Sequence, residues 1–207
     1  MALTIETGSE TRLLIVPALF DEANRMRRFT VETMRALGSV GIDTFLPDLP
    51  GCNESLAPLK TQTLSSWQEA AGRAAQTFGV THALTIRGGA LVAPAEIPCI
   101  RYAPVAGAKI LRAMLRARSI QAREAGRVEN LAGLAETGRK QGLDLSGWEM
   151  GAEMFRQMED AAPVTAGCTT IEQAELGSAG LWLRAEPGED ADQVRIFALL
   201  VAAAMKA

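Results

Sequence analysis

The residues of this sequence that could do chemistry gather in three short loops, each directly after an apolar run that predicts a strand. These loops are 17–25, 48–55 and 87–90. In an open sheet of parallel strands, ligands bind at the carboxyl ends of the strands. We therefore expect the three loops to meet at one end of the sheet and to form the functional site. Its candidate ligand-binding residues are Leu19, Phe20, Glu22, Arg25, Asp48, Cys52, Ser55, Arg87 and Gly88.

Nucleophilic acyl transfer needs a nucleophile, a base within hydrogen-bonding reach of it, and an acid that orients the base. Arg87 stands on the Gly-rich turn after the strand 83–86 and cannot be the nucleophile, because a guanidinium stays protonated at physiological pH. The only histidine, His82, precedes the strand 83–86 at its amino end. Five residues of strand separate it from Arg87 by about 16 Å. We therefore assign no catalytic residue, and we interpret His82 as a surface or structural side chain.

Cys52 and Ser55 are the alternative nucleophiles, because they lie on the loop after the strand 42–47. Neither has a histidine to activate it, although nearby cations such as Arg87 or Arg25 would lower the pKa of the Cys52 thiol. The alternative function is therefore an active hydrolase or acyltransferase with one of these two nucleophiles. The simpler interpretation makes Cys52 a small turn residue. Cys99 and Cys168 lie in strand-like runs and are expected to be buried and inert.

Arg87 projects five N–H donors into the ligand end of the predicted sheet. Backbone amides at a helix start also favour anions, so an unpaired cation there is disfavoured. We expect one of two occupants beside it. The first is a small anionic ligand, held also by the Gly88 amide and an amide of the loop 17–20. The second, which we favour, is a carboxylate of this chain, from Asp21, Glu22, Asp48 or Glu54.

The first predicted helix, 24–37, begins within a charged run. Asn24 is expected to be its N-cap, and Glu22 to interact favourably with the helix dipole. Arg25 and Arg28, three residues apart, share one face. We expect them to bind an acid of the loop 48–55 or to reach the same pocket as Arg87.

Strand and helix patterns alternate along the chain, and the strand patterns are near-continuous apolar runs. This predicts an α/β fold with a mostly parallel central sheet and helices on both faces. No linker divides residues 1–207, so we expect one domain, with the helices of 110–160 as a candidate cap. The predicted strands are 3–7, 13–16, 42–47, 83–86, 99–102, 164–171 and 181–185; the predicted helices are 24–37, one from Thr63, a short one after Arg87, 107–127, 151–161 and 190–204.

Composition excludes several classes of function. Apolar residues make up 48% of the 207 residues and charged residues 22%, and the net charge of −3 attracts neither nucleic acid nor an anionic membrane globally. No apolar stretch is long enough for a membrane span. Three cysteines without CxxC spacing fit reduced cytoplasmic thiols and no structural zinc site. We expect a cytoplasmic protein without metal or cofactor.

Charge is spread unevenly. From Lys109 to Lys140 there are eight basic residues and three acidic ones, whereas from Glu149 to Asp192 ten acidic residues face two arginines. Such a run is either a solvated face or a docking surface for a protein partner of opposite charge.

Four stretches carry a resemblance to a known family: "VPALFDEANRMRRF", "FLPDLPGCNES", "IRGGAL" and "RYAPVAGAKILRAMLRAR". They resemble the α/β-hydrolase superfamily, and within it the hydrolase-like proteins associated with the exosortase A system of exopolysaccharide-producing bacteria. The nucleophile elbow of α/β-hydrolases reads G-x-S-x-G. Here the same place reads Thr85-Ile86-Arg87-Gly88-Gly89, which keeps only the second glycine. Gly89 is expected to allow close helix–strand packing and a demanding backbone angle.

The resemblance covers most of the first 120 residues. It implies a small or reduced α/β-hydrolase-like fold, in an exosortase- or exopolysaccharide-linked setting. With the missing triad, it implies a degenerate hydrolase that acts as a binding or accessory protein.

Overall fold

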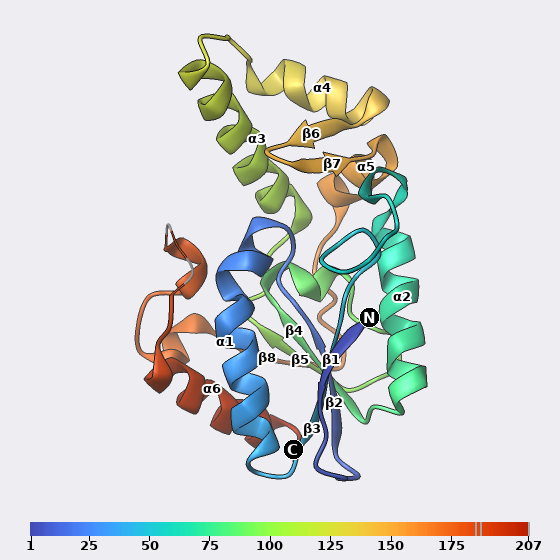
Figure 1. The fold of residues 1–207 in the computed structure, drawn as a ribbon, viewed down its shortest axis with the longest axis vertical. Coiled ribbons are helices and arrows are strands. Elements are labelled where there is room, and N and C mark those ends of the chain that lie inside the picture. Colours follow the sequence, from blue (N-terminus) through green and yellow to red (C-terminus); the bar gives the residue numbers. More distant parts are fainter. Residues whose placement is uncertain (185, 187, 207) are drawn as a thin grey trace.

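The computed structural model describes residues 1–184, 186 and 188–206, and a six-stranded sheet forms its centre. The strand order is β1-β3-β2-β4-β5-β8 (Figure 1). Every neighbouring pair is parallel except β1 and β3, which are antiparallel. The predicted mostly parallel sheet is thereby confirmed. The strands are β1 (Ala2–Ile5), β2 (Arg12–Val16), β3 (Asp43–Pro47), β4 (His82–Ile86), β5 (Cys99–Tyr102) and β8 (Cys168–Ile171).

Three long helices cover the two faces of this sheet: α1 (Asp21–Gly38), α2 (Leu64–Phe78) and α6 (Ala191–Ala204). Because successive strand residues point to opposite faces, the apolar run of β2 serves two cores. Leu13 and Ile15 pack with α1 and α6, whereas Leu14 and Val16 pack with α2. This is why the strands are continuously apolar rather than alternating.

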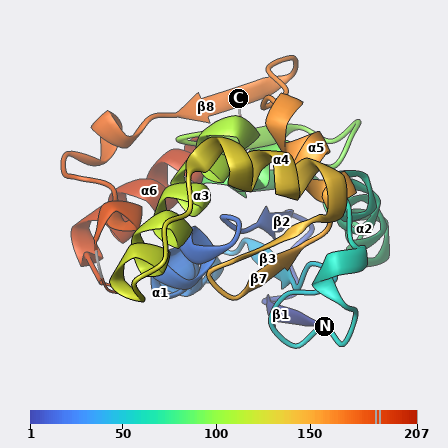
Figure 2. The same cartoon turned by 90° about the horizontal axis from the view of Figure 1, so that it is seen from above.

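A further segment, residues 107–160, stands above the carboxyl ends of the strands, and we call it the cap segment (Figures 1 and 2). Its Met154 and Phe155 belong to the same apolar cluster as Trp67 of α2. The two helices expected here are present, and a third helix and a hairpin lie between them. The elements are α3 (Gly107–Glu124), α4 (Leu131–Gln141), β6 (Leu143–Leu145), β7 (Trp148–Met150) and α5 (Ala152–Asp160).

The start of α1 differs from the prediction, because the helix begins at Asp21 and Asn24 is not its N-cap. Phe20 occupies the cap position with φ of 55°, and no side chain caps the helix. This backbone turn brings the chain from β2 into the helix three residues early. Asp21 and Glu22 therefore both lie in the first turn, where carboxylates interact favourably with the helix dipole.

The last part of the chain also differs from the prediction. Residues Leu181–Leu183 form a 3-10 turn instead of a strand, and Ala185 lies outside the described residues. Trp182 packs edge-on against Tyr102, while Leu183 is exposed. The run is apolar because Leu181 and the Trp182 ring both pack against the core, and β8 remains the edge strand. That strand begins only at Cys168, four residues later than predicted.

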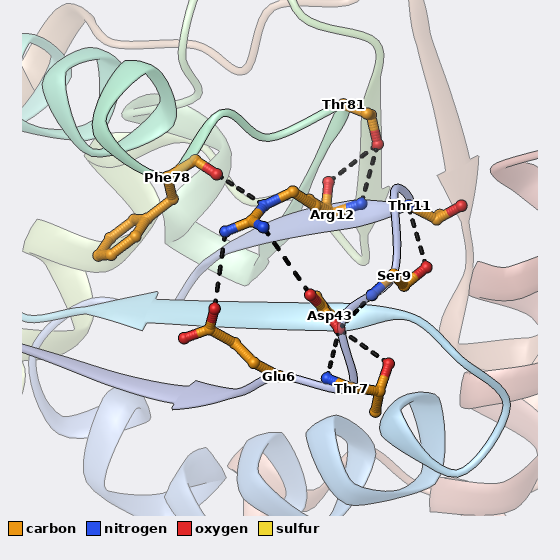
Figure 3. Close-up of polar contacts among 8 residues, drawn as sticks. All are labelled: Glu6, Thr7, Ser9, Thr11, Arg12, Asp43, Phe78 and Thr81. Atoms are coloured by element: carbon orange, nitrogen blue, oxygen red, sulfur yellow. Dashed lines mark hydrogen bonds and ion pairs between the residues drawn. The ribbon is translucent and has the colours of Figure 1, made fainter.

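A buried carboxylate, Asp43, joins the turn between β1 and β2 to the amino end of β3 (Figure 3). Its Oδ1 accepts hydrogen bonds from the Thr7 amide at 2.6 Å and the Thr7 hydroxyl at 2.9 Å. Arg12 Nη1 lies 3.9 Å from Oδ2. Burial by itself would raise the pKa of Asp43, but these donors, the Ser9 amide and the Arg12 charge outweigh it and hold the pKa below the usual value.

Within the described part of the chain, no helix has the length and apolar content to cross a membrane.

Candidate functional site

Arg87 is the first residue of the 3-10 turn Arg87–Leu91, directly after β4. Its φ is 54°, a left-handed backbone conformation that a non-glycine residue rarely adopts outside strained or functional sites. The demanding angle of the elbow therefore falls on Arg87, and the expectation that Gly89 would carry it is wrong. Gly89 instead allows close packing: a Cβ there would lie 2.5 Å from the Pro17 carbonyl oxygen and 2.6 Å from that of Val16.

The Arg87 side chain is buried and each of its three nitrogens donates a hydrogen bond to a group of this chain. Nε and Nη2 each donate to a different carboxylate oxygen of Glu22, both at 3.0 Å, which is a bidentate ion pair. Nη1 donates to the Ala103 carbonyl oxygen at 2.9 Å. The guanidinium carbon also lies 4.0 Å from the centre of the Trp182 ring, a cation–π contact. We expected either an anionic ligand or a carboxylate of this chain beside Arg87, and the structure shows the carboxylate of Glu22 there.

The space beside the elbow is filled by apolar side chains. A Cβ on Gly88 would lie 2.7 Å from Ile110 Cδ1 of α3 and 3.1 Å from Leu19 Cγ, so these side chains pack directly on the glycine. Leu19, Phe20 and Gly88 are all buried. In the α/β-hydrolases, which the sequence resembles, amides after the nucleophile and in the loop after an earlier strand bind the oxyanion. Here the corresponding segments lie under packed side chains.

The cap segment is tied to this end of the sheet through Trp148 of β7. Its indole Nε1 donates to Asp21 Oδ1 at 2.9 Å. The Phe20 ring lies edge-on to Trp148, 5.5 Å between centroids, and 5.6 Å from the Trp67 ring. Asp21 therefore binds the hairpin of the cap segment, whereas its neighbour Glu22 pairs with Arg87.

Arg25 and Arg28 of α1 do not bind the loop 48–55, contrary to expectation. Arg25 Nη1 donates to the Trp182 carbonyl oxygen at 3.1 Å, so it supports the ring that stacks on Arg87. Arg28 forms an ion pair with Glu189, two residues before α6. The reason is that α1 turns this face toward α6 and the 180–184 segment. Asp48 accepts instead from the Asn53 side chain at 2.9 Å.

Cys52 is half-buried, and its surroundings suppress its reactivity. Burial, together with the negative charge of Asp48, raises the pKa of its thiol to about 12. The two cations considered as its activators are held elsewhere, Arg87 by Glu22 and Arg25 by the Trp182 carbonyl oxygen. Ser55 Oγ accepts the Gly51 amide at 3.0 Å, a turn-forming role. Burial likewise raises the pKa of Cys99 to about 12, whereas Cys168 is partly exposed rather than buried, because β8 is an edge strand.

Cys52 is expected to react very slowly with iodoacetamide at pH 8. A thiol with a pKa of about 12 has roughly a thousandfold less thiolate at that pH than an ordinary cysteine, and only the thiolate reacts. Mass spectrometry of the Cys52 peptide over time measures this, with free cysteine as the reference. Complete labelling within minutes would show an activated thiol.

His82 is the first residue of β4, at the opposite end of the strand from Arg87, as the sequence predicted. Its Nδ1 lies 3.0 Å from the Thr81 hydroxyl. It lines a groove of about 870 Å³ between α1 and α6, far from the elbow. His82 therefore cannot act on any group of the candidate site.

Three contributors to the site were not anticipated: Trp182, Trp148 and the Ala103 carbonyl. Each reaches Arg87 or its neighbours from a distant part of the chain. No local pattern pointed to them, although a tryptophan within a short apolar run is a common anchor residue.

Neither family models nor curated proteins match this sequence. Solved structures do match its fold. An esterase from Exiguobacterium antarcticum superposes with a TM-score of 0.57 at 12% identity, covering 100% of this chain and 96% of that chain. A hydrolase from Pseudomonas aeruginosa PA01 gives 0.57 at 14% identity, covering 100% and 94%. The bottromycin epimerase BotH, solved with bottromycin A2, gives 0.51 at 12% identity, covering 99% and 92%.

The fold is thus that of the α/β-hydrolases, in a small form of 207 residues. At the elbow, where enzymes of this fold place their nucleophile, this chain places an arginine paired with a glutamate.

Proposed function

We propose that this chain is an α/β-hydrolase-fold protein without hydrolytic activity that serves as a binding or accessory protein. The observation that carries the proposal is the Arg87–Glu22 pair at the nucleophile position. A guanidinium cannot attack a carbonyl carbon, and both partners are committed to each other rather than to a substrate.

The surroundings of the pair support a structural role for the former reaction site. Ile110 and Leu19 pack on Gly88, and the strained φ of Arg87 is maintained although no nucleophile needs it. Strain of this kind persists only when the surrounding contacts stabilise it. The elbow therefore acts as a joint between the sheet, α1 and the cap segment. A small anionic ligand at Arg87 would have to displace Glu22.

The alternative, an active hydrolase or acyltransferase using Cys52 or Ser55, lacks support in the geometry. The Cys52 thiol stays protonated at neutral pH, and the only histidine is at the other end of the sheet. The neighbours named as esterase and hydrolase share the fold, and BotH is a neighbour named for epimerisation. Membership of this fold is therefore compatible with functions other than hydrolysis.

The biological setting is a separate proposal. We propose an exosortase- or exopolysaccharide-linked role in the cytoplasm on the resemblance of the four quoted stretches alone. The similar solved structures do not support the exosortase-associated subgroup.

The expected result of a panel of short p-nitrophenyl esters is no turnover above buffer, and a fluorophosphonate probe should leave the protein unlabelled. An intact triad contributes many powers of ten to the rate, and this chain has neither its nucleophile nor its base. Arg87→Ser should be inactive as well, because no histidine accompanies the new serine. Turnover that disappears in Ser55→Ala or Cys52→Ala would establish the active-hydrolase alternative.

A further inference from the structure

One face of α3 carries a continuous stripe of positive charge. Lys109, Arg112, Arg116 and Arg123 are exposed and separated by three, four and seven residues, spacings that return to the same face of a helix. The stripe is about 21 Å long at the helical rise of 1.5 Å per residue. Arg127 extends it into the following loop.

These cations lack ion-pair partners of their own. Arg127 lies near Glu129, but the pKa of that carboxyl is lowered mainly by its hydrogen bond with Arg118 and less by the charge of Arg127. None of the five forms an ion pair within the described part of the chain, whereas their neighbour Arg118 is paired with Glu129. Two acidic residues lie near these cations. Glu159 is paired with Arg139, and Glu124 lies beside the stripe at the end of α3. The whole chain carries a net charge of −3, so its composition does not account for this row of unpaired positive charges. The stripe is a local feature of the surface.

Exposed aliphatic side chains lie at the end of the same stripe. Ile120 is 56% exposed, Val128 99% and Leu131 40%, all at or beside the turn that joins α3 to α4. This turn is a projecting end of the molecule, on the far side from the amino ends of the strands (Figure 1). Beside it, a shallow groove of about 410 Å³ runs between α3 and α4, with Arg112 and Arg116 among its lining residues and Leu131 and Phe155 in its wall.

We propose that this surface, the α3 stripe with the α3–α4 turn, docks the protein on a membrane that contains anionic lipids. The cations would contact lipid phosphates and carboxylates, and the three aliphatic side chains would enter the interfacial region of the bilayer. Basic residues beside exposed apolar ones on a projecting helix are the combination that interfacial binding needs. The mode is peripheral and requires no spanning helix.

The chemistry of the surface favours a membrane over other polyanions. Single-stranded nucleic acid is held by aromatic side chains that stack on bases, and none of the exposed residues of this stripe and turn is aromatic. Protein interfaces concentrate Tyr, Trp and Arg around a desolvated centre. Here the exposed apolar groups are aliphatic and lie at the projecting α3–α4 turn, beside Arg123 and Arg127, a combination suited to shallow insertion.

The test is co-sedimentation of the full chain with vesicles of phosphatidylcholine alone and of phosphatidylcholine containing one third phosphatidylglycerol. We expect binding to the anionic vesicles only, weakened by salt because the contacts are electrostatic. The stripe variant Arg112→Glu/Arg116→Glu/Arg123→Glu should bind at least about a hundredfold more weakly, since each cation near an anionic surface contributes about fivefold. Ile120→Asn/Val128→Asn should also weaken vesicle binding. Its loss of binding should change less with salt concentration than the loss in the stripe variant.

The matched control is Arg35→Glu/Arg73→Glu/Arg195→Glu, which changes net charge equally at three well-exposed positions outside the cap segment. It should keep vesicle binding close to the wild-type level, and circular dichroism should show all variants folded. The proposal is overturned if the wild-type chain fails to bind anionic vesicles, if it binds neutral vesicles equally, or if the two charge-reversal variants lose binding equally. Binding to poly-glutamate or an oligonucleotide without binding to vesicles would assign the surface to that partner instead. None of these outcomes depends on whether the elbow is catalytic.

Discussion

Replacing Glu22 with alanine is expected to lower the free energy of unfolding by about 3 kcal/mol, the usual cost of removing one partner from a buried ion pair. The Arg87 side chain is only 10% exposed, and two of its nitrogens donate to Glu22. Without the carboxylate, a buried cation remains beside the positive end of a helix. Urea unfolding at pH 7 followed by circular dichroism measures the loss.

The second arm of this experiment removes the cation as well. Arg87→Met/Glu22→Ala is expected to recover part of the stability that Glu22→Ala loses, because the uncompensated charge is then gone. Glu32→Ala is the matched control, since Glu32 lies on the same helix in an exposed pair with Arg35. It should change the unfolding free energy by less than about 0.5 kcal/mol. Equal losses in Glu22→Ala and Glu32→Ala would contradict a buried pair.

The other large effect is expected at Asp43, where replacement with alanine should cost about 3 kcal/mol. Asp43 is fully buried, and its removal leaves the Thr7 amide and hydroxyl without an acceptor. The turn between β1 and β2 would lose its attachment to β3 (Figure 3). Thermal and urea unfolding measure the loss, with Glu10→Ala, an exposed residue of the same turn, as the control.

The same residue predicts a pH dependence. The folded-state pKa of Asp43 lies below its ordinary value of 3.8, so the folded state favours the ionised form more than the unfolded state does. The resulting stabilisation is fully present above the unfolded-state pKa and is lost as the pH falls through the folded-state pKa. The stability difference between wild type and Asp43→Asn should therefore be constant from pH 7 to about pH 5 and shrink below 3.8. A difference that does not change down to pH 2 would exclude this linkage.

The sheet was predictable because its strands are buried on both faces and so appear as continuous apolar runs. The 143–150 hairpin was missed although the sequence holds a turn dipeptide, Ser146-Gly147. In the structure both residues have positive φ, as a tight two-residue turn requires. Its strands have only three residues each, too few for an alternating pattern to be recognised.

The sequence predicted that Arg87 needs a negative partner, but it did not predict which residues contact Arg87. Arg87 required a counter-charge, which limited the choice to four nearby acids, but choosing Glu22 needed the exact start of α1. That start depends on the positive φ of Phe20, a backbone feature with no sequence signature at a non-glycine residue. Trp182 lies 95 residues from Arg87, and only the tertiary fold brings them together. The raised pKa of Cys52 comes from its burial and from the charge of Asp48, and the burial of a loop residue has no local sequence signal.

The central claim is that the Glu22 carboxylate occupies the anion position beside Arg87 at the elbow, and chemical rescue tests it most directly. The melting temperature of Glu22→Ala is measured in increasing acetate, with chloride at equal ionic strength as the reference. The account predicts that acetate raises the melting temperature of Glu22→Ala, because a small carboxylate can enter the vacated place beside Arg87 and stabilise the folded state by mass action. Wild type and Arg87→Met/Glu22→Ala should not respond. A wild-type response as large as that of Glu22→Ala, or no response in Glu22→Ala, would contradict the account.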